Sequence, residues 1–273
     1  MIKLDFQINK YYLAYVLFNK SSQPEDFFDP PIKQKIQSFR KKLWKEYKNN
    51  PSYYFIHLVS YKHIKWAIEN IYLKDNPSSS EVQIKKLPKD IQKIFQVIFQ
   101  SPVFKIILKE TNQYKNSVKD QWSQNQNFVL NYLEKIIGEK LPNISVPVNI
   151  IHPRLKQGRV NSSRSIIWGH PEDWSNYSIV YLTHELLHIV FNYYKIPQND
   201  LSHAIIELIS DNELRIRLNQ KGKYFKEGRK NIGHPHLRKI EKKILPHWSK
   251  YLKNKQKNIC SLYKKMNKKY CRF

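Results

Sequence analysis

The order of apolar and polar positions divides the chain into a strand, a long helical region and a mixed region. Ile2, Leu4, Phe6 and Ile8 alternate with polar residues, which predicts a strand within residues 1–18. Between Ile32 and Gly138 apolar residues recur at helical spacing instead. The helical stretches are marked by Ile36, Phe39, Leu43 and Trp44, by Phe55, Leu58, Val59, Trp66, Ile68 and Ile71, by Ile91, Ile94, Phe95, Ile98 and Phe99, and by Val118, Trp122, Val129, Leu133 and Ile136, with breaks at Pro51, at residues 76–80 and at Ser101-Pro102.

The pattern changes after residue 140. Residues 146–151 and 163–168 are short, β-branched and bounded by Pro, Gly and Ser, which predicts two strands. Apolar residues on both sides of residues 184–188 predict a buried helix, which Ser175 or Asn176 can cap. Residues 201–215 repeat the helical spacing after a turn at Pro197 and Asp200, so a second buried helix is expected there.

The first of these two helices carries the most informative motif, His184-Glu185-x-x-His188. Two His four residues apart on a helix project to one side, where both can bind one zinc ion. Glu185 then lies beside the open coordination position, where it can take a proton from water. A buried helix rarely holds such polar residues unless something satisfies them, so the motif predicts a zinc site.

The third ligand separates the classes of zinc enzyme. A metzincin-like site needs a His six residues after His188 and a Gly three residues after it, but Tyr194 and Phe191 stand there. Glu207 on the second helix offers a carboxylate that can complete a His, His, Glu set and leave the fourth position to water. We therefore expect Glu207 to be the third ligand.

The motif His184 to His188, followed by Glu207-x-x-x-Asp211, resembles the gluzincin metallopeptidases, which include thermolysin and the zinc aminopeptidases. The resemblance implies that His184, His188 and Glu207 bind zinc and that Glu185 is the general base. It implies that Asp211 accepts a hydrogen bond from the outer nitrogen of a ligand His, with His184 preferred. It also implies that an edge strand before the metal helix, here residues 164–168, holds the substrate backbone.

The resulting fold prediction is α+β and mainly helical: a zincin-like catalytic core with a small sheet, an active-site helix and a glutamate helix. We expect a mainly helical region over residues 1–140, the catalytic core over residues 141–220, and a basic helical region over residues 221–273, with a single compact domain as the alternative. Other side chains can stabilise an oxyanion or be ordinary surface groups, and no spacing singles one out. These are His170, Tyr193, His203, Tyr224, His234 and His236, of which His234 and His236 are favoured because they lie in a Gly/Pro loop after the glutamate helix.

Charge adds a second possible function. The chain of 273 residues has a net charge of +26, and residues 221–273 hold eighteen Lys and Arg against Glu227 and Glu241. Such a segment can bind nucleic acid, an anionic membrane or an acidic partner. Apolar residues recur through it at helical spacing, so the charges can equally be the solvated outer faces of packed helices. No recognisable nucleic-acid-binding module accompanies them.

Two features bear on location. Cys260 and Cys271 are the two cysteines, which implies no disulfide framework. The apolar residues 11–18 are too few to span a membrane and are not followed by a signal-peptide cleavage site. A cytoplasmic protein without a transmembrane segment is expected.

The leading functional prediction is a zinc-dependent metallopeptidase that hydrolyses a peptide or protein substrate, with Zn²⁺ as cofactor and Glu185 as the catalytic base. The alternative is a regulatory or nucleic-acid-associated protein on a zincin scaffold, using the basic carboxyl-terminal region.

Overall fold

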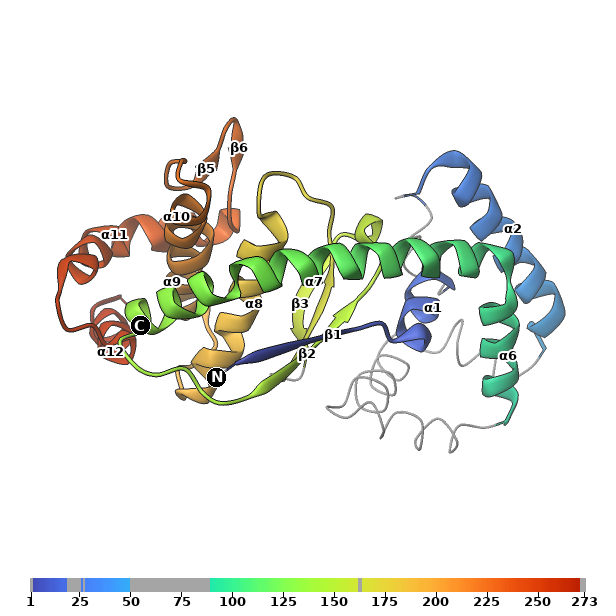
Figure 1. Ribbon diagram of the computed structural model, residues 1–273, viewed down its shortest axis with the longest axis horizontal. Helices are drawn as coiled ribbons and strands as arrows, with labels where there is room; N and C mark the ends of the chain where they lie inside the picture. Colours follow the sequence, from blue (N-terminus) through green and yellow to red (C-terminus); the bar gives the residue numbers. More distant parts are fainter. Residues whose placement is uncertain (1, 19–25, 27, 50–88, 162–163, 271–273) are drawn as a thin grey trace. The chain divides into compact units, whose positions relative to one another are not determined.

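The computed structural model describes residues 2–18, 26, 28–49, 89–161 and 164–270, and this part of the chain is mainly helical with a small mixed sheet (Figure 1). The residues divide into two compact units. Unit 1 comprises Met1–Leu4, Val118–Val146 and Glu172–Phe273, and unit 2 comprises Asp5–Ser117 and Pro147–Pro171. Each unit therefore combines segments that are far apart in the sequence.

The periodicity of the amino-terminal half predicts four of the elements that the structure describes there. The alternating residues form strand β1 (Lys3–Gln7). Three of the predicted helical stretches are helices α2 (Pro30–Tyr47), α6 (Lys89–Gln100) and α7 (Pro102–Ile137). The stretch from Phe55 to Ile71 lies outside the described residues. A further helix, α1 (Lys10–Phe18), occupies the apolar segment after β1.

The predicted break at Ser101-Pro102 separates α6 from α7. Proline is tolerated in the first turn of a helix but not in its interior, so α7 begins at Pro102. The hydroxyl of Ser101 accepts a hydrogen bond from the Phe104 amide at 3.3 Å, which satisfies one of the amides that a helix start leaves without a partner.

Unit 2 is built on an apolar core contributed by α1, α2, α6 and the start of α7. Leu13, Leu17, Ile36, Phe104 and Ile107 are fully buried in this core. Tyr11 of α1 packs edge-on against two aromatic rings of α6, with ring centroids 5.0 Å from Phe95 and 4.9 Å from Phe99. The aromatic residues of these helices are core residues, as their spacing predicts.

The sheet has the strand order β1-β2-β4-β3. The two predicted strands are β2 (Ser145–Ile150) and β4 (Ser165–Gly169), which pair in parallel. The third strand, β3 (Gln157–Asn161), follows a short 3₁₀ turn, η3 (Pro153–Leu155), and pairs with β4 in antiparallel register, Val160 opposite Ile166.

This order corrects the prediction that residues 164–168 form an edge strand. Strand β4 is covered by β2 on one side and by β3 on the other, so its backbone is already paired. The edge belongs to β3, which sequence reasoning missed because Gly158 and Arg159 interrupt any apolar alternation.

Unit 1 contains the second half of α7 and all elements after residue 172. Helix α8 (Tyr177–Tyr193) carries the His184 motif, and α9 (Asp200–Glu207) ends at the predicted glutamate. Helices α8 and α9 both pack against the π-helical segment η4 (Leu208–Leu214), and α11 and α12 pack on α9 (Figure 1). The remaining elements are α10 (Arg215–Asn219), the hairpin β5 (Lys226–Glu227) and β6 (Lys230–Asn231), the 3₁₀ turn η5 (Pro235–Leu237), and the helices α11 (Arg238–Lys253) and α12 (Ile259–Tyr270).

Helix α8 is buried over most of its length, as predicted, but it is not capped as predicted. Asn176 precedes the helix with a left-handed backbone (φ 62°) and makes no side-chain capping bond. The side-chain nitrogen Nδ2 of Asn176 donates instead to Oδ1 of Asn219 at 2.9 Å. The Glu172 carboxylate accepts from the Ser178 amide at 3.2 Å, so a negative group still occupies the positive end of the helix dipole.

Within the described residues, no helix combines the length and the apolar character that crossing a membrane requires.

Candidate metal centre

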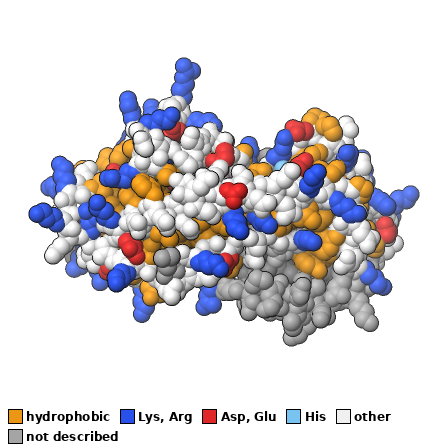
Figure 2. Space-filling model, in the orientation of Figure 1, with side chains coloured by type: hydrophobic (Ala, Val, Ile, Leu, Met, Phe, Trp, Pro, Cys, Tyr) orange, Lys and Arg blue, Asp and Glu red, His pale blue; other side chains and the backbone are white. Residues whose placement is uncertain are grey.

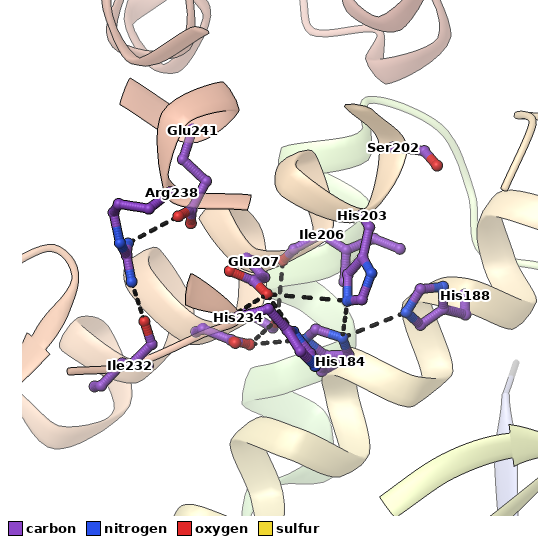
Figure 3. Close-up of polar contacts among 12 residues, drawn as sticks. His184, His188, Ser202, His203, Ile206, Glu207, Ile232, His234, Arg238 and Glu241 are labelled. Atoms are coloured by element: carbon purple, nitrogen blue, oxygen red, sulfur yellow. Dashed lines mark hydrogen bonds and ion pairs between the residues drawn. The ribbon is translucent and has the colours of Figure 1, made fainter. Parts of the chain in front are cut away.

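The two histidines of the motif lie on one side of α8, and their Nε2 atoms point toward each other (Figure 3). Nε2 of His188 is 3.3 Å from Nε2 of His184. His184 is almost completely buried, with 2% of its surface exposed, and His188 is half-buried. The four-residue spacing therefore aims both nitrogens at one point, as a shared metal ion requires.

Two overlapping groups of possible ligands surround this point in the described part of the chain. In the first group the ligand atoms of His184, His188 and His203 all lie within 4.8 Å of one another. The second group consists of His203, Glu207 and His234. Glu207, the predicted third ligand, is in the second group and not in the group that contains His184 and His188, and His203 belongs to both groups.

His203 and Glu207 face the site together because they are one turn apart on α9. Nε2 of His203 lies 3.0 Å from Nε2 of His184 and 3.9 Å from Oε1 of Glu207 (Figure 3). Helix α9 is fixed at its start by a reciprocal cap in which Asn199 and Ser202 bond each other's backbone amides. The orientation of both side chains is therefore set by a well-anchored helix.

Asp211 orients His184. Its Oδ1 lies 2.9 Å from Nδ1 of His184, and the Ser210 hydroxyl donates to the same oxygen at 2.6 Å. An ionised carboxylate only accepts hydrogen bonds, so Nδ1 carries the hydrogen and the electron pair needed for a metal resides on Nε2. The contact is the one that the resemblance implies for Asp211.

The path from Glu207 to Asp211 is a π-helical turn and not the α-helical turn that the spacing predicts. The Asn212 side chain donates to the Glu207 carbonyl at 2.9 Å and accepts from the Phe225 amide at 2.7 Å. These bonds, made by a buried amide, stabilise the wider turn of η4. Single π-helical turns are rare and concentrate at functional sites.

Gln198 orients His188 in a similar way. Its Oε1 lies 2.8 Å from Nδ1 of His188, and its Nε2 donates to the His188 carbonyl at 3.4 Å, which fixes the orientation of the amide. Nδ1 of His188 is therefore the donor, and Nε2 carries an electron pair. Two such nitrogens 3.3 Å apart need either a proton or a metal cation between them, so the pair can share a metal ion.

Glu207 is completely buried and is held by the loop that follows the hairpin. Its Oε1 accepts from the backbone amide of His234 at 2.8 Å and lies 2.5 Å from Nδ1 of the same residue. Gly233 has φ +76° and packs so closely that an added Cβ would lie 2.2 Å from Oε2 of Glu207. Only glycine allows the backbone to cover the carboxylate in this way.

The surroundings of the site are rich in buried carboxyl groups. Glu207, Asp211 and Glu241 are all completely buried. Arg238 lies 2.8 Å from Glu241 and also donates to the Ile232 carbonyl (Figure 3). Burial, followed by the nearby Glu207 carboxylate, raises the pKa of Glu241 to about 8. Buried carboxylates need compensating charge, and a divalent cation at the histidine pair would supply it.

The histidines differ in their affinity for protons. Burial lowers the pKa of His184, but the Asp211 carboxylate more than offsets this effect, and the pKa rises to about 9. Burial and the neighbouring His184 lower the pKa of His188 to about 4 and that of His203 to about 2. His188 and His203 are therefore neutral at physiological pH, as ligands must be, and a metal ion would replace the proton on His184.

The remaining predicted residues are placed as follows. Glu185 is half-buried on α8 beside His184, and its charge helps to raise the His184 pKa. His203 and His234 line the site, and His236 packs edge-on against His234 with ring centroids 5.6 Å apart. Tyr224 is engaged with Glu213 and Trp248, Tyr193 is 58% exposed, and His170 belongs to unit 2.

Sequence reasoning did not identify His203 or Gln198 as parts of the metal centre. The sequence could have predicted the position of His203, because His203 lies four residues before Glu207 and must share its helix face. Gln198 could not be predicted in this way, since it precedes α9 and reaches His188 through the turn between the two helices.

We expect Asp211→Asn to weaken zinc binding by roughly tenfold to a hundredfold, because the amide no longer fixes the hydrogen on Nδ1 of His184. The measurement is a zinc competition titration with a chromophoric chelator. Asp200→Asn, at the exposed start of α9, is the matched control and should bind zinc like the unmodified chain. Equal affinities for Asp211→Asn and the unmodified chain would contradict this role.

No family model, curated protein or solved structure matches this chain. The resemblance to the gluzincins therefore rests on the motif residues alone.

Proposed function

We propose that the chain is a zinc-dependent peptidase whose metal ion is held by His184, His188 and Glu207. The observation that supports the proposal is the 3.3 Å distance between Nε2 of His184 and Nε2 of His188. Nδ1 of His184 is held by Asp211, and Nδ1 of His188 is held by Gln198. Imidazole and carboxylate ligands are the set that zinc prefers in catalytic sites. The buried Glu207 adds the negative charge that such sites contain.

The side chains have separate roles in this proposal. His184, His188 and Glu207 hold the cofactor, and Asp211 and Gln198 orient the imidazoles. The bound metal would polarise a peptide carbonyl and make water more acidic. Glu185 takes a proton from the attacking water and later delivers it to the departing amine. Its half-buried position beside His184 supports this role because a ligand set alone has no need of a carboxylate there.

The substrate in this proposal is a peptide or an exposed segment of a protein. The cysteine count supports the predicted cytoplasmic location, since two cysteines do not provide a disulfide framework. Chelation should abolish hydrolysis of a susceptible peptide from a broad library, and added zinc should restore it. Hydrolysis that persists in excess chelator would count against a metal-dependent enzyme.

The second candidate function, nucleic-acid binding, is favoured by the charge of α11 and α12. Figure 2 shows Lys and Arg side chains spread over the visible face with few acidic ones between them. The segment from Arg238 to Tyr270 has one acidic residue, the buried Glu241. Its basic residues are Arg238, Lys239, Lys242, Lys243, Lys250, Lys253, Lys255, Lys257, Lys264, Lys265, Lys268 and Lys269.

The two helices enclose a groove of about 240 Å³ where phosphates could bind. Its lining includes Lys250, Lys265 and His247 together with neutral amides and a hydroxyl, and it contains no acidic side chain. Burial and the charges of Lys269, Lys265 and Lys250 lower the pKa of His247, as expected where positive charges gather.

If this groove binds nucleic acid, Lys250→Gln with Lys265→Gln should lower affinity at low salt and reduce the slope of log affinity against log salt by about two. The pair Lys119→Gln and Lys135→Gln on exposed positions of α7 removes the same charge elsewhere. Fluorescence anisotropy with duplex and single-stranded oligonucleotides gives both quantities. Equal losses in the two double variants, or no binding by the unmodified chain, would leave only a solvated helical face.

A further inference from the structure

His203 lies as close to the histidine pair as a metal ligand would, although it is not one of the three proposed ligands. Its Nε2 lies 3.0 Å from Nε2 of His184, closer than Nε2 of His188 at 3.3 Å. Ligand atoms about 2.0–2.1 Å from a tetrahedral ion are separated by roughly 3.3 Å. His203 therefore occupies a place that fits a corner of the same coordination shell, and its Nε2 lies 3.9 Å from Oε1 of Glu207.

The ring of His203 is packed among the other histidines of the site. Ring centroids are 5.0 Å apart for His203 and His184, 4.8 Å for His203 and His188, and 4.7 Å for His203 and His234. The side chain points inward between α8 and the loop that bears His234 (Figure 3). A water molecule or a substrate carbonyl at the fourth position would have to displace this ring.

His203 is held much less firmly than the other possible ligands. Nδ1 of His184 is anchored by Asp211, and Nδ1 of His188 is anchored by Gln198. Within the described residues Nδ1 of His203 has no hydrogen-bond partner. The side chain is also 25% exposed, whereas Glu207 is completely buried. Outer partners fix the orientation of a ligand and strengthen it, so His203 is the ligand that can leave.

We propose that His203 is a fourth, displaceable protein ligand that closes the metal centre until a substrate takes its place. This inference rests on the proposed function, because it requires an ion at His184, His188 and Glu207. In the closed state the site contains three imidazoles and one carboxylate. In the open state His203 turns toward solvent, and one coordination position becomes available beside Glu185.

The test counts imidazole ligands directly by zinc X-ray absorption spectroscopy on the full chain. We expect three imidazoles per zinc in the unmodified protein and two in His203→Phe and His203→Ala, with about one zinc per chain retained in all three. His247→Phe, which removes a histidine of α11 that is in neither ligand group, is the matched control and should retain three. Circular dichroism and thermal melting check that each variant folds.

A second measurement uses azide as a small probe ligand on the cobalt-substituted protein. The cobalt absorption bands should shift at roughly tenfold lower azide concentration in His203→Ala than in the unmodified chain, because no side chain competes for the open position. Two imidazoles per zinc in the unmodified protein, or an unchanged azide response, would overturn the inference.

The remaining outcomes are also distinct. Complete zinc loss from both folded His203 variants, as expected for His188→Ala, would make His203 an obligatory ligand and would overturn its displaceable role. An unmodified protein that binds no zinc would overturn the proposed function itself, and this inference with it.

Discussion

Glu185→Gln should lower the rate of peptide hydrolysis by at least about a hundredfold while leaving zinc content and thermal stability unchanged. The amide has nearly the same shape as the carboxylate but cannot take a proton from water at neutral pH. Glu185 is half-buried on α8 and belongs to neither group of ligand atoms, so its replacement should leave the metal in place. Initial rates on a susceptible peptide, measured beside zinc content, check both halves of the expectation.

The control for this experiment is Glu134→Gln, at an exposed position of α7. It changes the net charge by the same amount and should retain full activity. Equal turnover by the unmodified chain and Glu185→Gln would mean that the activity comes from a contaminant or that the mechanism is wrong.

His188→Ala is expected to reduce bound zinc from about one ion per chain to nearly none, because the two anchored ligands that remain, His184 and Glu207, seldom hold zinc tightly. The melting temperature gives an independent measurement. A metal that binds only the folded state stabilises it, so chelation should lower the melting temperature of the unmodified chain but not that of the variant. His184→Ala should behave in the same way, and His247→Ala should bind zinc normally. Full zinc occupancy in both motif variants would rule out the site.

Several elements of the fold were predictable because their apolar residues form clear patterns. The alternation at Leu4 and Phe6 predicts β1, and the spacing of Ile36 and Leu43 predicts α2. Strand β3 was missed because its polar residues and Gly158 resemble a loop, and its pairing with β4 depends on tertiary structure. Without β3 the central strand β4 was wrongly predicted to be an edge strand.

The candidate site was partly predictable for a similar reason. Side chains four residues apart on one helix must share a face, so the convergence of His184 and His188 follows from sequence. The contact between Asp211 and His184 was expected from the resemblance, but the π-helical segment that carries Asp211 is not specified by local propensity. The packing of Gly233 and His234 against Glu207 joins residues far apart in the sequence and is visible only in the structure.

The most direct test of the metal centre is a zinc-edge anomalous difference map from crystals grown without chelator. We expect one strong peak about 2.0–2.1 Å from Nε2 of His184, Nε2 of His188 and a carboxylate oxygen of Glu207. A peak elsewhere in the molecule, or no peak between the two imidazoles in crystals with added zinc, would contradict this expectation.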